Sequence, residues 1–105
     1  MATDINPAPT LVSFAPPHPN PTNGHAVFSF EVPSRAVVVL EILDIRGRRI
    51  RTVERSEMAA GNYILDWDGR DHGQQQVADG VYFAQLRVRG PGVNETVTRK
   101  VTVVR

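Results

Sequence analysis

The chain has 105 residues, of which 41% are hydrophobic and 22% are charged, a composition that indicates one globular domain and excludes a disordered tail. Twelve lysines and arginines are balanced by eleven acidic residues, and the resulting net charge of +1 favours neither nucleic acid nor an anionic membrane as a partner. The absence of cysteine excludes disulfide bonds, thiolate metal sites and cysteine nucleophiles.

The N-terminus carries no recognisable export signal. Residues 1–4 lack the basic stretch and following apolar stretch that a signal peptide has. No run in the chain approaches the roughly 20 apolar residues of a membrane-spanning helix. We therefore expect no membrane insertion. Either the protein stays where it is made, or the chain is a piece of a longer secreted protein with an added start methionine, and we expect the second.

Proline-rich segments begin the chain. Residues 1–9 are expected to be a linker or an added N-terminus, because their prolines cannot donate to a regular ladder. The domain itself is expected at residues 10–105. An apolar run at 11–14 predicts a short edge strand, and the prolines of 16–21 favour extended backbone before a turn.

A strand and a hairpin follow. Residues 26–32 alternate apolar and polar side chains, which predicts a half-buried strand. Residues 37–43 are apolar on both faces, as expected for a central strand that is packed on each side. A turn at Gly47, capped by the Asp44 side chain, leads to a strand at 48–53 that alternates again.

Three more strands are expected in the second half. Residues 63–67 alternate and place Trp67 in the core. Turn-forming residues at 68–73 predict a loop. Residues 80–88 and about 93–104 are expected to be strands, the last with alternate valines on its inner face.

These elements predict the fold class. Seven strands separated by short turn signals are typical of a sandwich. No segment carries an apolar helical stripe longer than two turns. We expect an all-β protein, an immunoglobulin-like antiparallel β-sandwich of about seven strands.

Five short motifs occur in an order that resembles a known family. The motifs are Pro19-Asn20-Pro21, Leu43-Asp44-Ile45-Arg46-Gly47-Arg48, Trp67-Asp68-Gly69-Arg70-Asp71, Gly80-Val81-Tyr82-Phe83 and Lys100-Val101-Thr102-Val103-Val104-Arg105. Together they resemble the Ig-like domain of the flagellar hook-capping protein FlgD and the closely similar C-terminal sorting domains of the type IX secretion system. The resemblance covers residues 12–105.

The resemblance implies a binding role without catalysis. It implies a C-terminal sorting and anchoring domain of a secreted bacterial protein, recognised by an outer-membrane machinery and held at the cell surface. The partner is then a protein, either that machinery or a neighbouring domain. The terminal segment would be what the machinery reads, through Lys100, Val101, Val103 and Arg105. As pure structure, the same segment is a closing strand whose valines complete the core.

Arginines give the one local charge bias, at the predicted hairpin. They are Arg46, Arg48, Arg49, Arg51 and Arg55. On an edge strand, such charges keep sheets from pairing with one another. Alternatively, Arg46, Arg48, Arg49 and Arg51 form a basic face for an acidic partner, a lipopolysaccharide phosphate or a neighbouring domain, with bidentate contacts from the guanidinium groups.

The sequence offers no convincing site for a metal, a cofactor or catalysis. Clustered carboxylates at Asp66, Asp68 and Asp71 are the kind of group that binds calcium, but their spacing does not match a calcium loop. The three histidines fall in predicted loops. No serine lies in a nucleophile elbow. We expect no cofactor and no enzymatic activity, and we leave calcium open.

Two alternatives to a sorting domain remain. One is a structural Ig-like module of the hook-cap or cell-surface type, which spaces or joins other domains. The other is a carbohydrate-binding module, for which aromatic side chains should stack on sugar rings. The few candidates are expected to point inward: Phe28, Phe30, Tyr63 and Trp67. Nothing in the sequence predicts an oligomeric state.

Overall fold

The structure is a computed structural model that describes residues 12–105. The expected linker at 1–9 and the start of the first expected strand, Leu11, lie outside the described residues.

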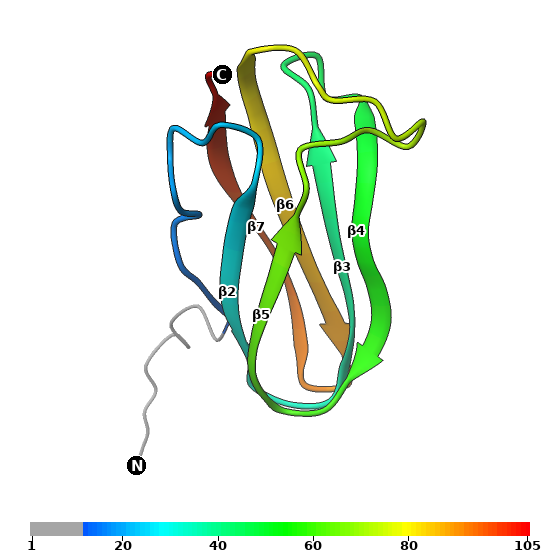
Figure 1. Ribbon diagram of the computed structural model, residues 1–105. Helices are drawn as coiled ribbons and strands as arrows, with labels where there is room; N and C mark the ends of the chain where they lie inside the picture. Colours follow the sequence, from blue (N-terminus) through cyan, green and yellow to red (C-terminus); the bar gives the residue numbers. More distant parts are fainter. Residues whose placement is uncertain (1–11) are drawn as a thin grey trace.

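Within residues 12–105, strands make two antiparallel sheets that pack face to face (Figure 1). The strands are β1 (Ser13–Phe14), β2 (Ala26–Val32), β3 (Ala36–Leu43), β4 (Arg49–Met58), β5 (Gly61–Trp67), β6 (Gly80–Gly90) and β7 (Val93–Val103). One sheet has the order β1-β2-β5 and the other β4-β3-β6-β7. The expected all-β immunoglobulin-like sandwich of seven strands is confirmed.

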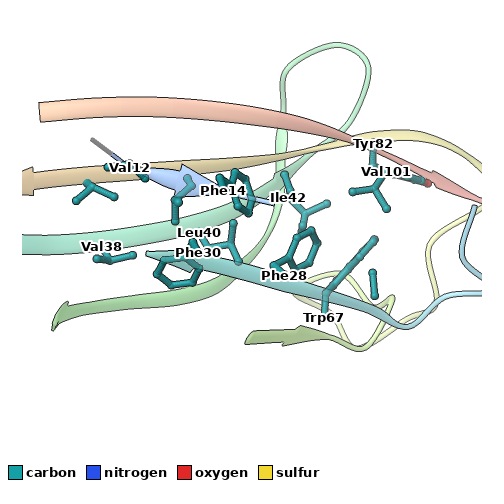
Figure 2. Packing of buried hydrophobic residues seen from close by; sticks show 14 of the residues in the cluster. Val12, Phe14, Phe28, Phe30, Val38, Leu40, Ile42, Trp67, Tyr82 and Val101 are labelled. Carbon is teal, nitrogen blue, oxygen red and sulfur yellow. The ribbon is translucent and has the colours of Figure 1, made fainter. Parts of the chain in front are cut away.

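The core lies between the sheets because each strand turns alternate apolar side chains inward. Phe28 of β2, Leu40 of β3 and Leu86 of β6 are each 0% exposed. Figure 2 shows Phe28, Trp67, Tyr82 and Val101 gathered in this interior. Trp67 is 1% exposed, as its place in the alternating run predicts.

Strand β3 is central to its sheet, between β4 and β6. Its inner face carries Leu40 and Ile42, and its outer face carries Val39, which is only 7% exposed. The strand is central in its sheet, as expected, but only its inner face packs against the other sheet. On its outer face Val37 is 48% exposed and Glu41 is charged.

Strand β4 is longer than its sequence pattern indicates. The expected strand ends at residue 53, whereas β4 continues to Met58, which pairs with Ala36. Two register shifts interrupt the pairing of β3 with β4, one between Leu40 and Glu41 and one between Ile42 and Leu43. The sequence pattern does not predict the second half of β4, because residues 54–57 of this edge strand are all polar and give no apolar alternation.

Tyr82 ties the start of β6 to the loop before it. Its hydroxyl donates to the Ala78 carbonyl at 2.6 Å, the arrangement known in immunoglobulin-like sandwiches as a tyrosine corner. Its ring meets Trp67 edge-on, with ring centroids 6.1 Å apart, and the Trp67 indole N–H donates to the Arg70 carbonyl at 3.0 Å. Burial raises the pKa of the Tyr82 phenol above its ordinary value of 10.0.

The backbone at position 69, in the motif that begins at Trp67, requires a glycine. Gly69 has a φ of +77°, and a Cβ at this position would lie 2.2 Å from the Gly24 carbonyl oxygen. The loop after β5 and the segment before β2 thus meet backbone to backbone, which only glycine allows.

Candidate functional site

The terminal residues predicted for recognition do not share one surface. Lys100 is exposed and pairs with Phe83 of β6. Val101 and Val103 are both 0% exposed and belong to the core. In the folded domain, therefore, a partner that touches β7 meets Lys100 but neither valine.

The Arg105 side chain is held by the loop between β5 and β6. Its guanidinium donates to the Val77 carbonyl and, at 3.4 Å, to the Gly69 carbonyl. It lies 4.0 Å from a carboxylate oxygen of Asp79, and only 25% of the side chain is exposed. Arg105 thus closes one end of the sandwich.

The outer edge of β7 is covered near its C-terminal end by residues 20–22, here called the strap. The Asn20 side-chain amide donates to the Lys100 carbonyl at 3.0 Å and accepts from the Thr102 N–H at 2.9 Å. Thr22 then donates to the Thr102 carbonyl at 2.8 Å and accepts from the Val104 N–H at 2.9 Å. Because the strap occupies these groups, another strand cannot pair there while it is in place.

The middle of the same strand contacts the N-terminal segment through side chains. Arg99 of β7 donates from Nε to the Phe14 carbonyl at 2.8 Å. The Val12 N–H donates to a carboxylate oxygen of Glu95 at 3.3 Å. Segments from the two ends of the described chain are therefore joined along most of β7.

Two of the arginines predicted to form a basic face lie in the turn between β3 and β4. The Asp44 carboxylate accepts from the backbone N–H groups of Arg46 and Arg48, both at 2.9 Å, and from Arg48 Nε at 2.9 Å. These bonds, led by the Arg48 N–H, lower the pKa of the Asp44 carboxyl below its ordinary value of 3.8. Asp44 caps the turn, as its position in the sequence predicts.

The other two predicted arginines diverge. Arg51 donates to the Asp68 carboxylate at 3.1 Å and to the Arg70 carbonyl at 3.0 Å, in the loop after β5. Arg49 instead donates to Glu41 at 3.1 Å. The four arginines therefore do not form one face, because the register shifts beside Glu41 and Leu43 break the alternation on which that interpretation depended.

A different charged cluster lies on the outer face of the four-stranded sheet. Glu41 of β3 is only 5% exposed. Its carboxylate accepts from Arg49 and, at 3.2 Å, from Arg87 of β6, and Arg55 of β4 lies 3.8 Å away. Buried carboxylates of this kind persist in proteins when they are paired.

The sequence analysis missed this cluster, although it contained a signal. Glu41 is the one charged residue in the apolar run at 37–43, and a charge there needs partners from the neighbouring strands. Which residues pair with Glu41 depends on the register between strands, and the register shifts between β3 and β4 cannot be predicted from the apolar pattern of one strand.

The aspartates considered for calcium have structural roles. Asp68 accepts from Arg51 and from the Arg70 N–H at 3.0 Å. Asp71 accepts from the backbone N–H groups of residues 73 and 75, whereas Asp66 lies 3.7 Å from His25. Among residues 12–105 no group of three or more histidine, cysteine or acidic side chains is arranged to hold a metal ion.

In the described part of the chain, no helix has the length and apolar character needed to cross a bilayer.

The two packed antiparallel sheets, with the orders β1-β2-β5 and β4-β3-β6-β7, define an immunoglobulin-like β-sandwich module. The chain belongs to the FlgD Ig-like domain family, whose model matches residues 18–90. No curated protein matches the chain.

Two solved structures resemble the chain. The dimeric latent form of PorU from Porphyromonas gingivalis matches with a TM-score of 0.73 and 25% sequence identity, over 92% of this chain and 10% of that chain. The alkylpurine DNA glycosylase AlkC from Pseudomonas fluorescens, bound to DNA with an abasic site analogue, matches with a TM-score of 0.44 and 15% identity, over 90% of this chain and 31% of that chain. The chain thus spans about a tenth of PorU.

Proposed function

We propose that the chain is a non-catalytic sorting and anchoring domain of a secreted bacterial protein, recognised by an outer-membrane secretion machinery and attached at the cell surface. The resemblance of its ordered motifs to type IX sorting domains motivates this proposal. The match to a tenth of a bacterial protein, PorU, supports it, since the same fold there serves as one module of a far longer chain.

The observation that carries the proposal is the division of β7 into a buried face and a displayed face. Val101 and Val103 are 0% exposed, while Thr96, Thr98 and Lys100 on the opposite face are exposed. Lys100 is the only lysine of the chain. A machinery that reads the folded domain would contact Lys100 and its neighbours on this outer face, since the strap covers the edge.

A fusion experiment tests the export role. The full chain is placed at the C-terminus of a reporter that carries a signal peptide, in a bacterium with a type IX system and in a strain that lacks the translocon. We expect the reporter at the cell surface or in the medium of the first strain only. Retention in the periplasm of the competent strain would contradict the proposal.

Exposed charges allow a matched test of the surface that is read. Lys100→Glu reverses a charge on the displayed face of β7, and Arg46→Glu reverses an exposed charge in the β3–β4 turn. We expect Lys100→Glu to lower the surface-delivered fraction and Arg46→Glu to leave it unchanged, with both thermal unfolding midpoints close to that of the parent. Equal delivery of the two variants would exclude Lys100 from recognition.

A structural spacer is the second candidate, favoured by the extent of the family match. The matched segment ends at Gly90 and leaves β7 out, so membership in the family does not depend on the terminal strand. On this alternative, the fusion stays in the periplasm of both strains and Lys100→Glu changes nothing.

A further inference from the structure

An arginine-lined groove lies on the outer face of the four-stranded sheet, the face on which β7 displays Thr96, Thr98 and Lys100. Thr96 is the cross-strand partner of Arg87, which lines the groove. It consists of two adjoining hollows of about 490 and 340 Å³ that share Val37 and Arg89. The larger hollow lies against the turns at 33–35 and 91–92, at the lower end of the sandwich in Figure 1. The smaller one lies over Val39. Volumes of this size suit a small ligand or a few side chains of a partner.

Cross-strand pairing places valines of β3 at the bottom of the groove and charged side chains of β4 and β6 along its two sides. Val39 of β3 is flanked by Arg55 of β4 and Arg87 of β6. Two residues away, Val37 is flanked by Glu57 of β4 and Arg89 of β6. Val37 is 48% exposed, so an apolar strip accessible to a ligand runs between charged side chains.

Positive charge exceeds negative charge in and around the groove. Arg49, Arg55 and Arg87 share the single carboxylate of Glu41. Arg35 and Glu57 form an exposed pair at 3.7 Å. These arginines and Arg89 outnumber the two carboxylates by three, on a chain whose net charge is only +1.

Two arginine groups in the groove lack an acceptor. The Arg89 side chain makes no hydrogen bond or ion pair with any of residues 12–105. Arg87 Nε is buried without an acceptor within the same residues. Arg87 Nε is shielded from an incoming ligand, whereas Arg89 is exposed and is the unpaired group that an anion can reach.

We propose that this groove binds an extended acidic segment of a partner protein, with carboxylates at alternate positions. Two residues of extended chain span about 6.7 Å, the same repeat that separates the Val39 and Val37 pairs. One carboxylate then lies between Arg55 and Arg87, and the next lies on the Arg89 side of Val37, opposite Glu57. The aliphatic stems lie on the two valines. Guanidinium groups bind carboxylates through paired hydrogen bonds.

A peptide fits the groove better than a sugar does. Neither hollow is lined by an aromatic ring, so an acidic polysaccharide would lack the flat apolar surface on which pyranose rings stack. The inference goes beyond the export role, because peptide binding can be measured on the isolated chain and holds or fails independently of delivery to the surface.

The test uses a synthetic peptide and the whole chain in 0.15 M salt. The peptide is acetylated and amidated, with five residues, glutamate at its second and fourth positions and serine elsewhere. Binding is followed by the backbone amide shifts of Val37, Val39 and Arg89 in nuclear magnetic resonance spectra. Controls are the same peptide with glutamine in place of glutamate, and inorganic phosphate.

We expect saturable shifts with the glutamate peptide and none with the glutamine peptide. Arg89→Gln should weaken binding about fivefold, as expected for loss of one exposed charge pair. The matched change Arg46→Gln, which removes the same charge outside the groove, should leave the affinity unchanged.

Three results would overturn the proposal. The first is equal weakening by Arg89→Gln and Arg46→Gln, which would indicate attraction to net charge only. The second is the same shifts with inorganic phosphate at similar affinity, which would indicate a general anion site. The third is saturable binding that Arg89→Gln leaves intact. Arg89 is exposed, and an unchanged unfolding midpoint verifies that the variant folds.

Discussion

At the scale of single residues, one hydroxyl group links the core to the loops. Tyr82 donates to the Ala78 carbonyl and packs on Trp67, so the corner that starts β6 depends on a bond that phenylalanine cannot make. Tyr63 makes a bond of the same length, 2.6 Å, to the Ala59 carbonyl, but in an exposed position. Comparison of Tyr82 with Tyr63 therefore separates the effect of burial on stability from the effect of the hydrogen bond itself.

Tyr82→Phe should lower the free energy of unfolding by about 1–2 kcal/mol, because a partly buried carbonyl loses its donor. Tyr63→Phe should cost about 0.5 kcal/mol or less, since water replaces the lost bond. Urea unfolding followed by Trp67 fluorescence measures both. Equal losses in the two variants would show that the corner has no special contribution.

The same tyrosine predicts a dependence on alkaline pH. Its pKa in the folded chain lies above the ordinary value of 10.0, so the unfolded chain releases this proton first. The stability associated with the neutral phenol is complete below pH 10 and is lost as the pH rises through the folded pKa. The stability difference between the parent and Tyr82→Phe should therefore shrink above pH 10 in unfolding curves measured along a pH series.

At the scale of elements, the strap determines what the edge of β7 can do. Asn20 acts as a short piece of strand, because its amide satisfies both a carbonyl and an N–H of β7. The Asn20 side chain thus replaces backbone pairing with β7, because the prolines on either side of it have no N–H to donate.

Asn20→Ala should lower the free energy of unfolding by about 1–2 kcal/mol and speed hydrogen exchange of the Thr102 amide, since two hydrogen bonds are lost. Asn94→Ala, at an exposed position of the same strand, should change the stability by about 0.5 kcal/mol or less. Chemical denaturation and amide exchange provide the two readouts. Unaltered exchange at Thr102 would mean that the strap does not protect the edge.

The elements also show what sequence patterns can and cannot predict. Strands β2, β3 and β6 follow from period-two alternation or from a doubly apolar run, both of which reflect burial directly. The end of β4 and the partners of Glu41 depend on pairing and bulges, which leave no trace in a single strand's pattern. The role of Asn20 depends on a residue eighty positions away, beyond any local rule. The export role stays a prediction.

At the scale of the whole molecule, the last strand is part of the core. Removal of residues 100–105 would expose the cavity left by Val101 and Val103, both 0% exposed, at about 1.5–3 kcal/mol each. Domains of this size have a total stability of about 5–15 kcal/mol, so the truncated chain should unfold at much lower temperature. Circular dichroism on heating measures this, with Lys100→Glu as the folded control. A truncated chain as stable as its parent would contradict the assignment of β7 to the core.

The contacts that complete the sandwich join residues more than eighty positions apart: Val12 with Glu95, Phe14 with Arg99, and Asn20 with Thr102. Such distant pairs form late, because a long loop must close before any of them is gained. Until these contacts form, the segment at 12–22 and the outer edge of β7 do not cover one another. Closure of the sandwich along β7 is therefore the step that the length of the intervening chain delays most.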